Sequence, residues 1–157
     1  MRNKMWFSFQ KKCESLTGLL LVVMIALIFT QVLTRYVFDY SISWSEELTR
    51  YLFVWMIFLS LNLTIRDNLP IRIDLIDQFL PKKAKRMIDI IVMILSMFTF
   101  IVFAYSAYMF MLRGVLSTSP ALGLPLYIAY AAMPVGFILS IIATIHSLLD
   151  NYRGGQK

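Results

Sequence analysis

The sequence is short of charge, of cysteine and of histidine, and each shortage excludes a class of protein. Only 15% of its 157 residues are charged, against about 25% in a typical soluble domain. Cys13 is the only cysteine, which excludes an intramolecular disulfide framework and a multi-cysteine metal site. His146 is the only histidine, which excludes a bis-histidine haem or a His-rich metal cluster built by this chain alone. A composition that is 59% hydrophobic indicates an integral membrane protein instead.

Four stretches are apolar enough to cross a bilayer, which requires about 20 residues in a helix. The predicted spans are residues 15–34, 45–65, 88–112 and 126–149. The second stretch is long enough only if its helix begins in the charged segment before Tyr51. Pro134 is expected to kink the fourth span or to remove a local hydrogen bond. We therefore predict an all-α integral membrane protein, a four-helix transmembrane bundle that forms a single domain over residues 1–157.

The distribution of basic residues predicts the orientation of these spans. Twelve of the fifteen Lys and Arg residues lie in the N-terminal tail, in the segment between the second and third spans, and in the C-terminal tail. The other three are Arg35, Arg50 and Arg113, which lie on the opposite side. Basic loops are retained in the cytoplasm, so both termini are predicted to be cytoplasmic. The net charge of +6 is thus attributed to topology and not to binding of nucleic acid.

A short amphipathic segment precedes the third span. When residues 70–80 are wound as a helix, apolar side chains cover one broad arc, which Arg72 interrupts. The residues taken to mark this helix are Ile71, Arg72, Leu75 and Phe79. About ten residues cannot span a membrane, so we predict a helix lying along its cytoplasmic face, in contact with lipids. The alternation over residues 70–75 also fits a strand, but a strand edge in lipid would leave backbone groups unpaired.

Charged and aromatic residues gather where the first span ends and the second begins. This predicted outer cluster consists of Arg35, Asp39, Trp44, Glu46, Glu47, Arg50 and Tyr51. Glu46 and Glu47 precede Arg50 by four and three residues, so either carboxylate can pair with it on a helix, and Ser43 with Glu46 matches a capping box. One interpretation is therefore purely structural. The other is a docking patch for a partner on the outer face. A cation site is less favoured, because adjacent helical residues point about 100° apart.

The fourth span carries small residues at four-residue steps, namely Ala132, Gly136 and Ser140, which form a predicted helix-packing seam. Such a seam permits close approach of another helix, either from this chain or from a second subunit. No acidic residue falls within the interior of any predicted span, and proton-coupled pumps usually keep a carboxylate or His there. No phosphate loop, nucleophile–base arrangement or metal-ligand spacing is present. We therefore expect no cofactor, no bound metal and no enzymatic activity.

Four segments, taken in order, form a recognisable pattern: Arg35-Tyr36, SWSEELTRYLFVW over residues 43–55, IRIDL over residues 71–75, and SPALGLP over residues 119–125 with the Tyr130 and Pro134 that follow. In this pattern the sequence resembles the small membrane subunit of tripartite ATP-independent periplasmic (TRAP) transporters, and the resemblance covers nearly the whole chain. Pro70 and Ser60 depart from the family pattern, which often has His and Gly at these positions. Neither departure removes a known chemical group, so both concern subfamily placement and not the family.

The resemblance implies a multi-pass protein of the bacterial inner membrane with two protein partners. A large multi-span membrane subunit would carry the substrate and sodium sites, and a periplasmic binding protein would deliver an organic acid of the C4-dicarboxylate or sialic acid class. This chain would be a non-catalytic small permease subunit that scaffolds the large one. The alternative is a self-sufficient homo-oligomeric four-span exporter or channel. A membrane redox enzyme is a third possibility, opposed by the single His and the single Cys.

Overall fold

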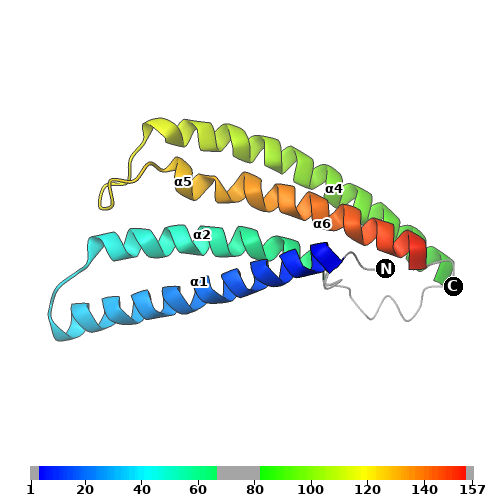
Figure 1. The fold of residues 1–157 in the computed structure, drawn as a ribbon. Helices are drawn as coiled ribbons and strands as arrows, with labels where there is room; N and C mark the ends of the chain where they lie inside the picture. The colour runs from blue at the N-terminus through cyan, green and yellow to red at the C-terminus, as the bar shows by residue number, and fades with distance from the viewer. Residues whose placement is uncertain (1–3, 67–81, 155–157) are drawn as a thin grey trace.

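The computed structural model describes residues 4–66 and 82–154, which are almost entirely helical (Figure 1). The helices are α1 (Lys4–Val37), α2 (Ser43–Arg66), α4 (Lys82–Arg113), the 3-10 turn η1 (Gly114–Leu116), α5 (Tyr127–Tyr130) and α6 (Ala132–Gly154). Among the described residues, four helices are long and apolar enough to cross a membrane. The predicted all-α fold with four spans is therefore confirmed. The predicted interfacial helix at 70–80, with Ile71, Arg72, Leu75 and Phe79, lies outside the described residues.

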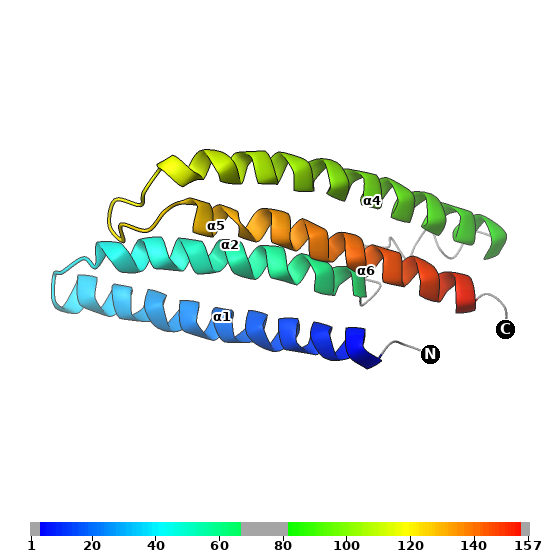
Figure 2. The same ribbon diagram turned by 45° about the horizontal axis from the view of Figure 1, so that its top comes forward.

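The four long helices lie side by side in an open row, in the order α1, α2, α6, α4 (Figures 1 and 2). α2 packs on α1 and on α6, and α6 also packs on α4, whereas α1 and α4 form the two edges of the row. α6 is consequently the most enclosed: 39% of its apolar segment is buried, against 6–11% for the other three. The remaining apolar surface faces outward along the row, as expected of helices that lie in hydrocarbon.

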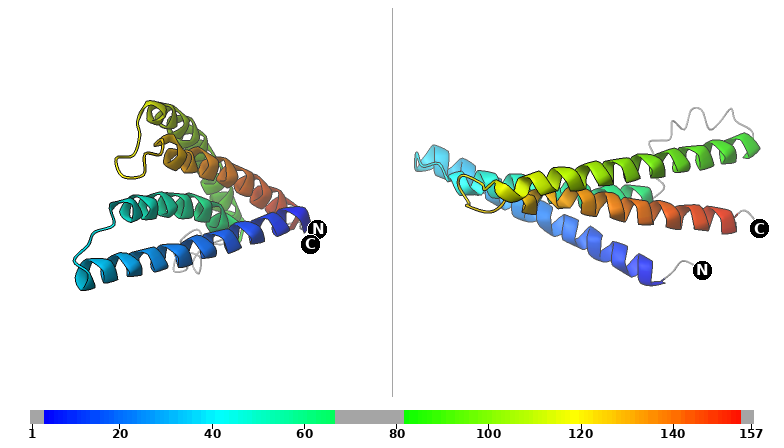
Figure 3. Two further views of the ribbon diagram at one scale, coloured as in Figure 1. Left: turned by 60° about the vertical axis from the view of Figure 1, so that its left-hand side comes forward. Right: turned by 90° about the horizontal axis from the view of Figure 1, so that it is seen from above.

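The row has two distinct ends. α1 begins and α6 ends at the same end, which we call the terminal end (Figure 3). At the opposite end, which we call the loop end, residues 38–42 join α1 to α2 and residues 117–126 join η1 to α5. At the terminal end, the Trp6 ring of α1 stacks on the His146 ring of α6 with 4.8 Å between centroids and 8° between planes. This stack joins two helices that otherwise diverge from each other.

α1 is much longer than the predicted first span. Its 34 residues correspond to about 51 Å at 1.5 Å per residue, whereas the hydrocarbon core is about 30 Å thick. The extension lies at the N-terminal side and carries Lys11, Lys12 and Glu14. Hydropathy marks the part of a helix that sits in hydrocarbon and not where its hydrogen bonding ends, so the charged first turns were not included in the prediction.

Two local features end the helices at the loop end. Asp39 has φ of 52°, in the left-handed region, and the amides of Phe38 and Tyr40 both bond to the Thr34 carbonyl at 3.2 and 3.1 Å. A left-handed residue after the last turn is a common way to terminate a helix. Near the start of the fourth span, the helix is interrupted at Ala131 because Pro134 has no N–H to donate to the Tyr130 carbonyl. The predicted effect of Pro134 is therefore observed as a break between α5 and α6.

Candidate functional site at the loop end

The Glu47 carboxylate of α2 holds the loop of residues 117–126. It accepts a hydrogen bond from the Ser119 hydroxyl. It also accepts hydrogen bonds from the backbone amides of Ala121, at 3.1 and 3.2 Å to its two oxygens, and of Leu122, at 3.0 Å. Two backbone amides and one hydroxyl from the same turn therefore converge on one carboxylate. We call this arrangement the loop clasp.

Glu47 binds the loop and does not form the close ion pair with Arg50 that local spacing allowed, although the Arg50 charge still acts on its carboxylate. Within residues 4–66 and 82–154, neither Glu46 nor Glu47 forms an ion pair with Arg50. Bonds between a carboxylate and several backbone donors are strengthened by the charge. The capping box of Ser43 and Glu46 is likewise not formed in this part of the chain. α2 already begins at Ser43, and the Ser45 amide bonds to the Ile42 carbonyl at 3.1 Å.

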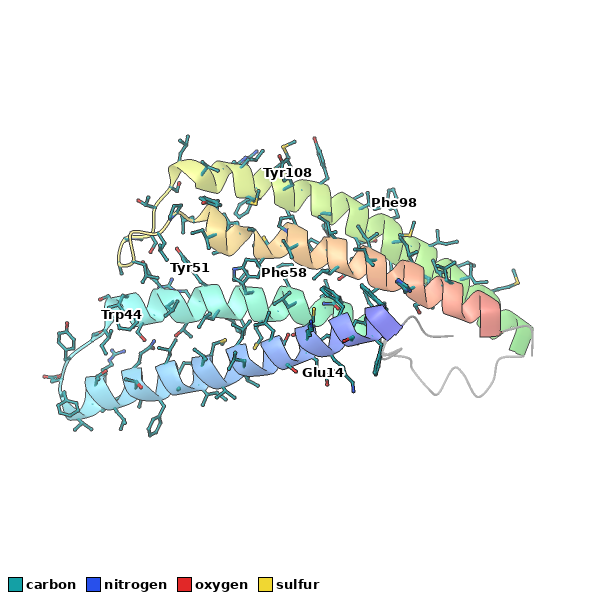
Figure 4. The ribbon with its side chains drawn as sticks, viewed as in Figure 1. Glu14, Trp44, Tyr51, Phe58, Phe98 and Tyr108 are labelled. Carbon is teal, nitrogen blue, oxygen red and sulfur yellow. The ribbon has the colours of Figure 1, made fainter. Side chains whose placement is uncertain are left out.

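The structure divides the predicted outer cluster into an inward and an outward part. Glu47 and Tyr51 are half-buried on the side of α2 that faces α5 and α6, the side on which Figure 4 also shows Phe58. The others are exposed and have no side-chain hydrogen bond or ion pair among the described residues: Arg35, Asp39, Trp44, Glu46 and Arg50. Four charges of the predicted outer cluster, two of each sign, are therefore exposed to a partner.

Two more polar contacts fix α2 at the loop end, and neither was predicted. The Gln31 side-chain amide of α1 donates to the Ser45 hydroxyl at 2.7 Å and to the Thr49 hydroxyl at 3.3 Å. The Trp55 indole N–H donates to the Ile128 carbonyl of α5 at 3.1 Å. Ser45 is only 2% exposed, so the first contact is an interhelical hydrogen bond inside the protein. The four-residue spacing of Ser45 and Thr49, which places both hydroxyls on one face of α2, is the signal in the sequence that could have indicated it.

The predicted packing seam of α6 lies against α2. Ala132 and Ser140 are 1% and 0% exposed, and Gly136 is buried beside Phe58. A methyl group placed on Gly136 would lie 2.6 Å from both the Cβ and the carbonyl oxygen of Phe58. Of the two partners that the sequence left open for this seam, the structure therefore provides a helix of the same chain.

The second half of α2 contains one fully buried polar side chain. Asn62 is 0% exposed, its side-chain NH₂ donates to the Leu59 carbonyl, and its side-chain oxygen has no partner among the described residues. On α6, Ser140 and Thr144 direct their hydroxyls to the carbonyls one turn earlier, at 2.8 and 2.9 Å. In the described part of the chain, no group of three or more His, Cys, Asp or Glu residues is placed to hold a metal ion.

The sequence is similar to known transporter proteins over most of its length. The family model described as "Tripartite ATP-independent periplasmic transporters, DctQ component" matches residues 24–154. A TRAP transporter small permease protein of Haemophilus influenzae is 30% identical over 143 residues, which is 91% of this chain and 87% of that protein. An isethionate TRAP transporter permease protein of Oleidesulfovibrio alaskensis is 31% identical over 83% of this chain. A sialic acid TRAP transporter permease protein of H. influenzae is 25% identical over 92% of this chain. The match spans only 22% and 23% of these last two proteins.

Proposed function

Because this chain belongs to the DctQ family of small permease subunits of TRAP transporters, we propose that it is the non-catalytic scaffold of such a transporter. It is a multi-pass protein of the bacterial inner membrane. The observation that carries the proposal is the match over most of the chain to a small permease protein of nearly equal length. The open row of helices supports it, because such a row offers long apolar faces to a membrane partner.

The large membrane subunit is the first proposed partner. Two relatives with permease names are about four times longer than the segment they share with this chain, which supports a large membrane component. We infer that this component carries the substrate and the sodium sites and that a periplasmic binding protein delivers the substrate. The relatives are named for sialic acid and isethionate. An organic acid is accordingly the proposed class of cargo.

We propose that the loop end of the row faces the periplasm. The uneven distribution of Lys and Arg supports this orientation. So do the exposed aromatic side chains at this end, such as Tyr36 and Tyr40, which are 81% and 66% exposed, since aromatic rings favour the membrane interface. The exposed charges of the cluster would then form the docking patch on the outer face: Arg35, Asp39, Glu46 and Arg50, with Trp44 beside them.

The assembly proposal is tested by purifying the tagged chain from mild detergent after expression from its native chromosomal locus. The mass of every co-purifying protein is then measured. A stable partner of many spans is the expected result, and transport of radiolabelled organic acids by that complex would define the cargo. A homo-oligomer without such a partner would contradict the proposal and favour a self-sufficient exporter or channel.

The docking patch is tested by reversing a single charge. Arg50→Glu should lower uptake several-fold, roughly the effect of an unfavourable charge at the edge of an interface, and it should leave membrane insertion unchanged. Arg113→Glu is the matched control, since Arg113 is also an exposed arginine at the loop end, at the end of α4 and outside the cluster. Equal uptake by wild type and Arg50→Glu would show that Arg50 has no docking role and would contradict a patch that includes it.

A further inference from the structure

The loop of residues 117–126 has its own internal hydrogen bonds. The Ser119 amide bonds to the Leu124 carbonyl at 2.8 Å, and the Gly123 amide bonds to the Ser119 carbonyl at 3.0 Å. The Leu126 amide bonds to the Ser117 carbonyl at 2.9 Å, so the first and last residues of the loop are joined by a hydrogen bond. Gly123 has φ of +66°, which lets the chain turn tightly. The loop is therefore shaped by its own backbone.

The end of the loop is attached to α2 through α5, which packs on α2, α4 and α6. The Trp55 indole of α2 donates to the Ile128 carbonyl of α5, but this bond does not reach the far side of the turn. The Ala121 and Leu122 amides lie at the far side of the turn, and their hydrogen bonds go to the Glu47 side chain of α2. Ser119, which is only 3% exposed, contributes the third donor. All three bonds cross from the loop to α2.

A carboxylate suits this position better than any other side chain. Its two oxygens accept three hydrogen bonds with no donor of their own, whereas a glutamine would present an NH₂ group toward backbone N–H groups. Charge also strengthens each bond. Since donors surround both oxygens, Glu47 is poorly placed to ligate a cation. Adjacent Glu46, which is exposed and makes no such bonds, is chemically identical and differs only in the direction that the helix gives it.

We propose that Glu47 is a positioning residue of the transporter, which fixes the 117–126 loop on α2 and so sets the shape of the loop end that uptake requires. The inference rests on the proposed transport function. It extends that function by separating Glu47 from the exposed charges of the docking patch. Glu47 acts through the loop and does not itself contact a partner.

The position of the loop is measured directly in the isolated subunit in lipid nanodiscs. Spin labels are attached at Ser41→Cys and Thr118→Cys, both exposed positions, in a Cys13→Ala background. The distribution of distances between the two labels is recorded by pulsed electron–electron double resonance. Glu47→Gln should broaden the distribution and raise the ratio of displaced to native loop by about tenfold or more, as expected for losing a charge-assisted hydrogen bond. Glu46→Gln should leave it unchanged. An unchanged distribution in Glu47→Gln would overturn the proposal.

Coupling and transport complete the test. Ser119→Ala should displace the loop in the same direction, and the effect of the double variant with Glu47→Gln should be smaller than the sum of the two single effects, since the two side chains share one bond. Additive effects would count against the loop clasp. In the assembled transporter, Glu47→Gln should lower uptake while the large subunit still co-purifies. If Glu47→Gln displaces the loop but supports uptake at the wild-type rate, uptake does not require the loop position and this part of the proposal is refuted. If the large subunit does not co-purify with the wild-type chain, the scaffold proposal is refuted instead.

Discussion

The close approach of α6 to α2 at Gly136 gives a sharp prediction for the packing of the row. Replacing Gly136 by Ala adds a single methyl group, whose carbon would lie 2.6 Å from the Phe58 Cβ, 2.6 Å from the Phe58 carbonyl oxygen and 2.9 Å from the Phe58 carbonyl carbon. Two of these three atoms belong to the backbone of α2. They cannot turn away as a flexible side chain would, so α2 and α6 must separate.

The expected cost follows from this separation. Ordinary contact begins near 3.4 Å, so the helices must move apart by about 0.8 Å, and a radial gap of 0.5–1 Å forfeits about a quarter to a half of each dispersion contact. Overpacking of this kind costs about 1–3 kcal/mol in a well-packed core. Ala also has a helix propensity about 1 kcal/mol better than Gly, which offsets part of that cost. Gly136→Ala should therefore be destabilised by up to about 2 kcal/mol.

A matched control isolates the steric cost. Gly18 lies in α1, is exposed, and a methyl group added there has no atom within 4 Å. Gly18→Ala therefore has the same change in helix propensity without a clash, and the two variants should differ by about 1–3 kcal/mol. The assay is unfolding in mixed detergent micelles, followed by helical circular dichroism. Equal stability of the two variants would show that α2 and α6 are not in this contact, and Gly136→Leu should destabilise the protein further.

Two other predictions concern the loop end. Asp39→Gly should stabilise the protein by up to about 1 kcal/mol, because glycine adopts the left-handed conformation without a steric cost. Asp39→Val should destabilise it by about 1–2 kcal/mol. The melting temperatures of the two variants are compared in detergent, and equal temperatures would contradict the left-handed conformation of residue 39. Gln31→Leu should lower stability by about 0.6 kcal/mol and at most about 1.7, the range measured for interhelical hydrogen bonds in membranes. Unfolding of this variant should be compared with Thr30→Val, since the exposed Thr30 hydroxyl bonds only within its own helix.

The helices were largely predictable because a membrane helix depends on its own sequence. Each span must satisfy its backbone groups internally, so hydropathy and length identify it without knowledge of its neighbours. Pro134 acts through a missing N–H one turn away, which is also a local effect. The charged beginning of α1 was missed because hydropathy does not register a helix that continues beyond the membrane.

The candidate site was predictable in composition but not in arrangement. The spacing of Glu46, Glu47 and Arg50 placed the candidate site at the start of α2. Local spacing also allowed a pairing with Arg50, whereas Glu47 bonds to Ser119, which lies 72 residues away in the sequence. The left-handed conformation of Asp39 was not predicted either, because aspartate is enriched there among non-glycine residues but mostly adopts other conformations.

Hydropathy and motif order are read along the chain, so they were enough to predict a membrane protein of four helical spans and to indicate its family. Three features came only from the folded structure: the helix order α1, α2, α6, α4, the contact of Gly136 with Phe58 of α2, and the inward direction of one of two adjacent glutamates. These features depend on contacts between segments far apart in the chain. Their energies arise from shape complementarity and from hydrogen bonds across helices, which the pattern of any single segment does not contain.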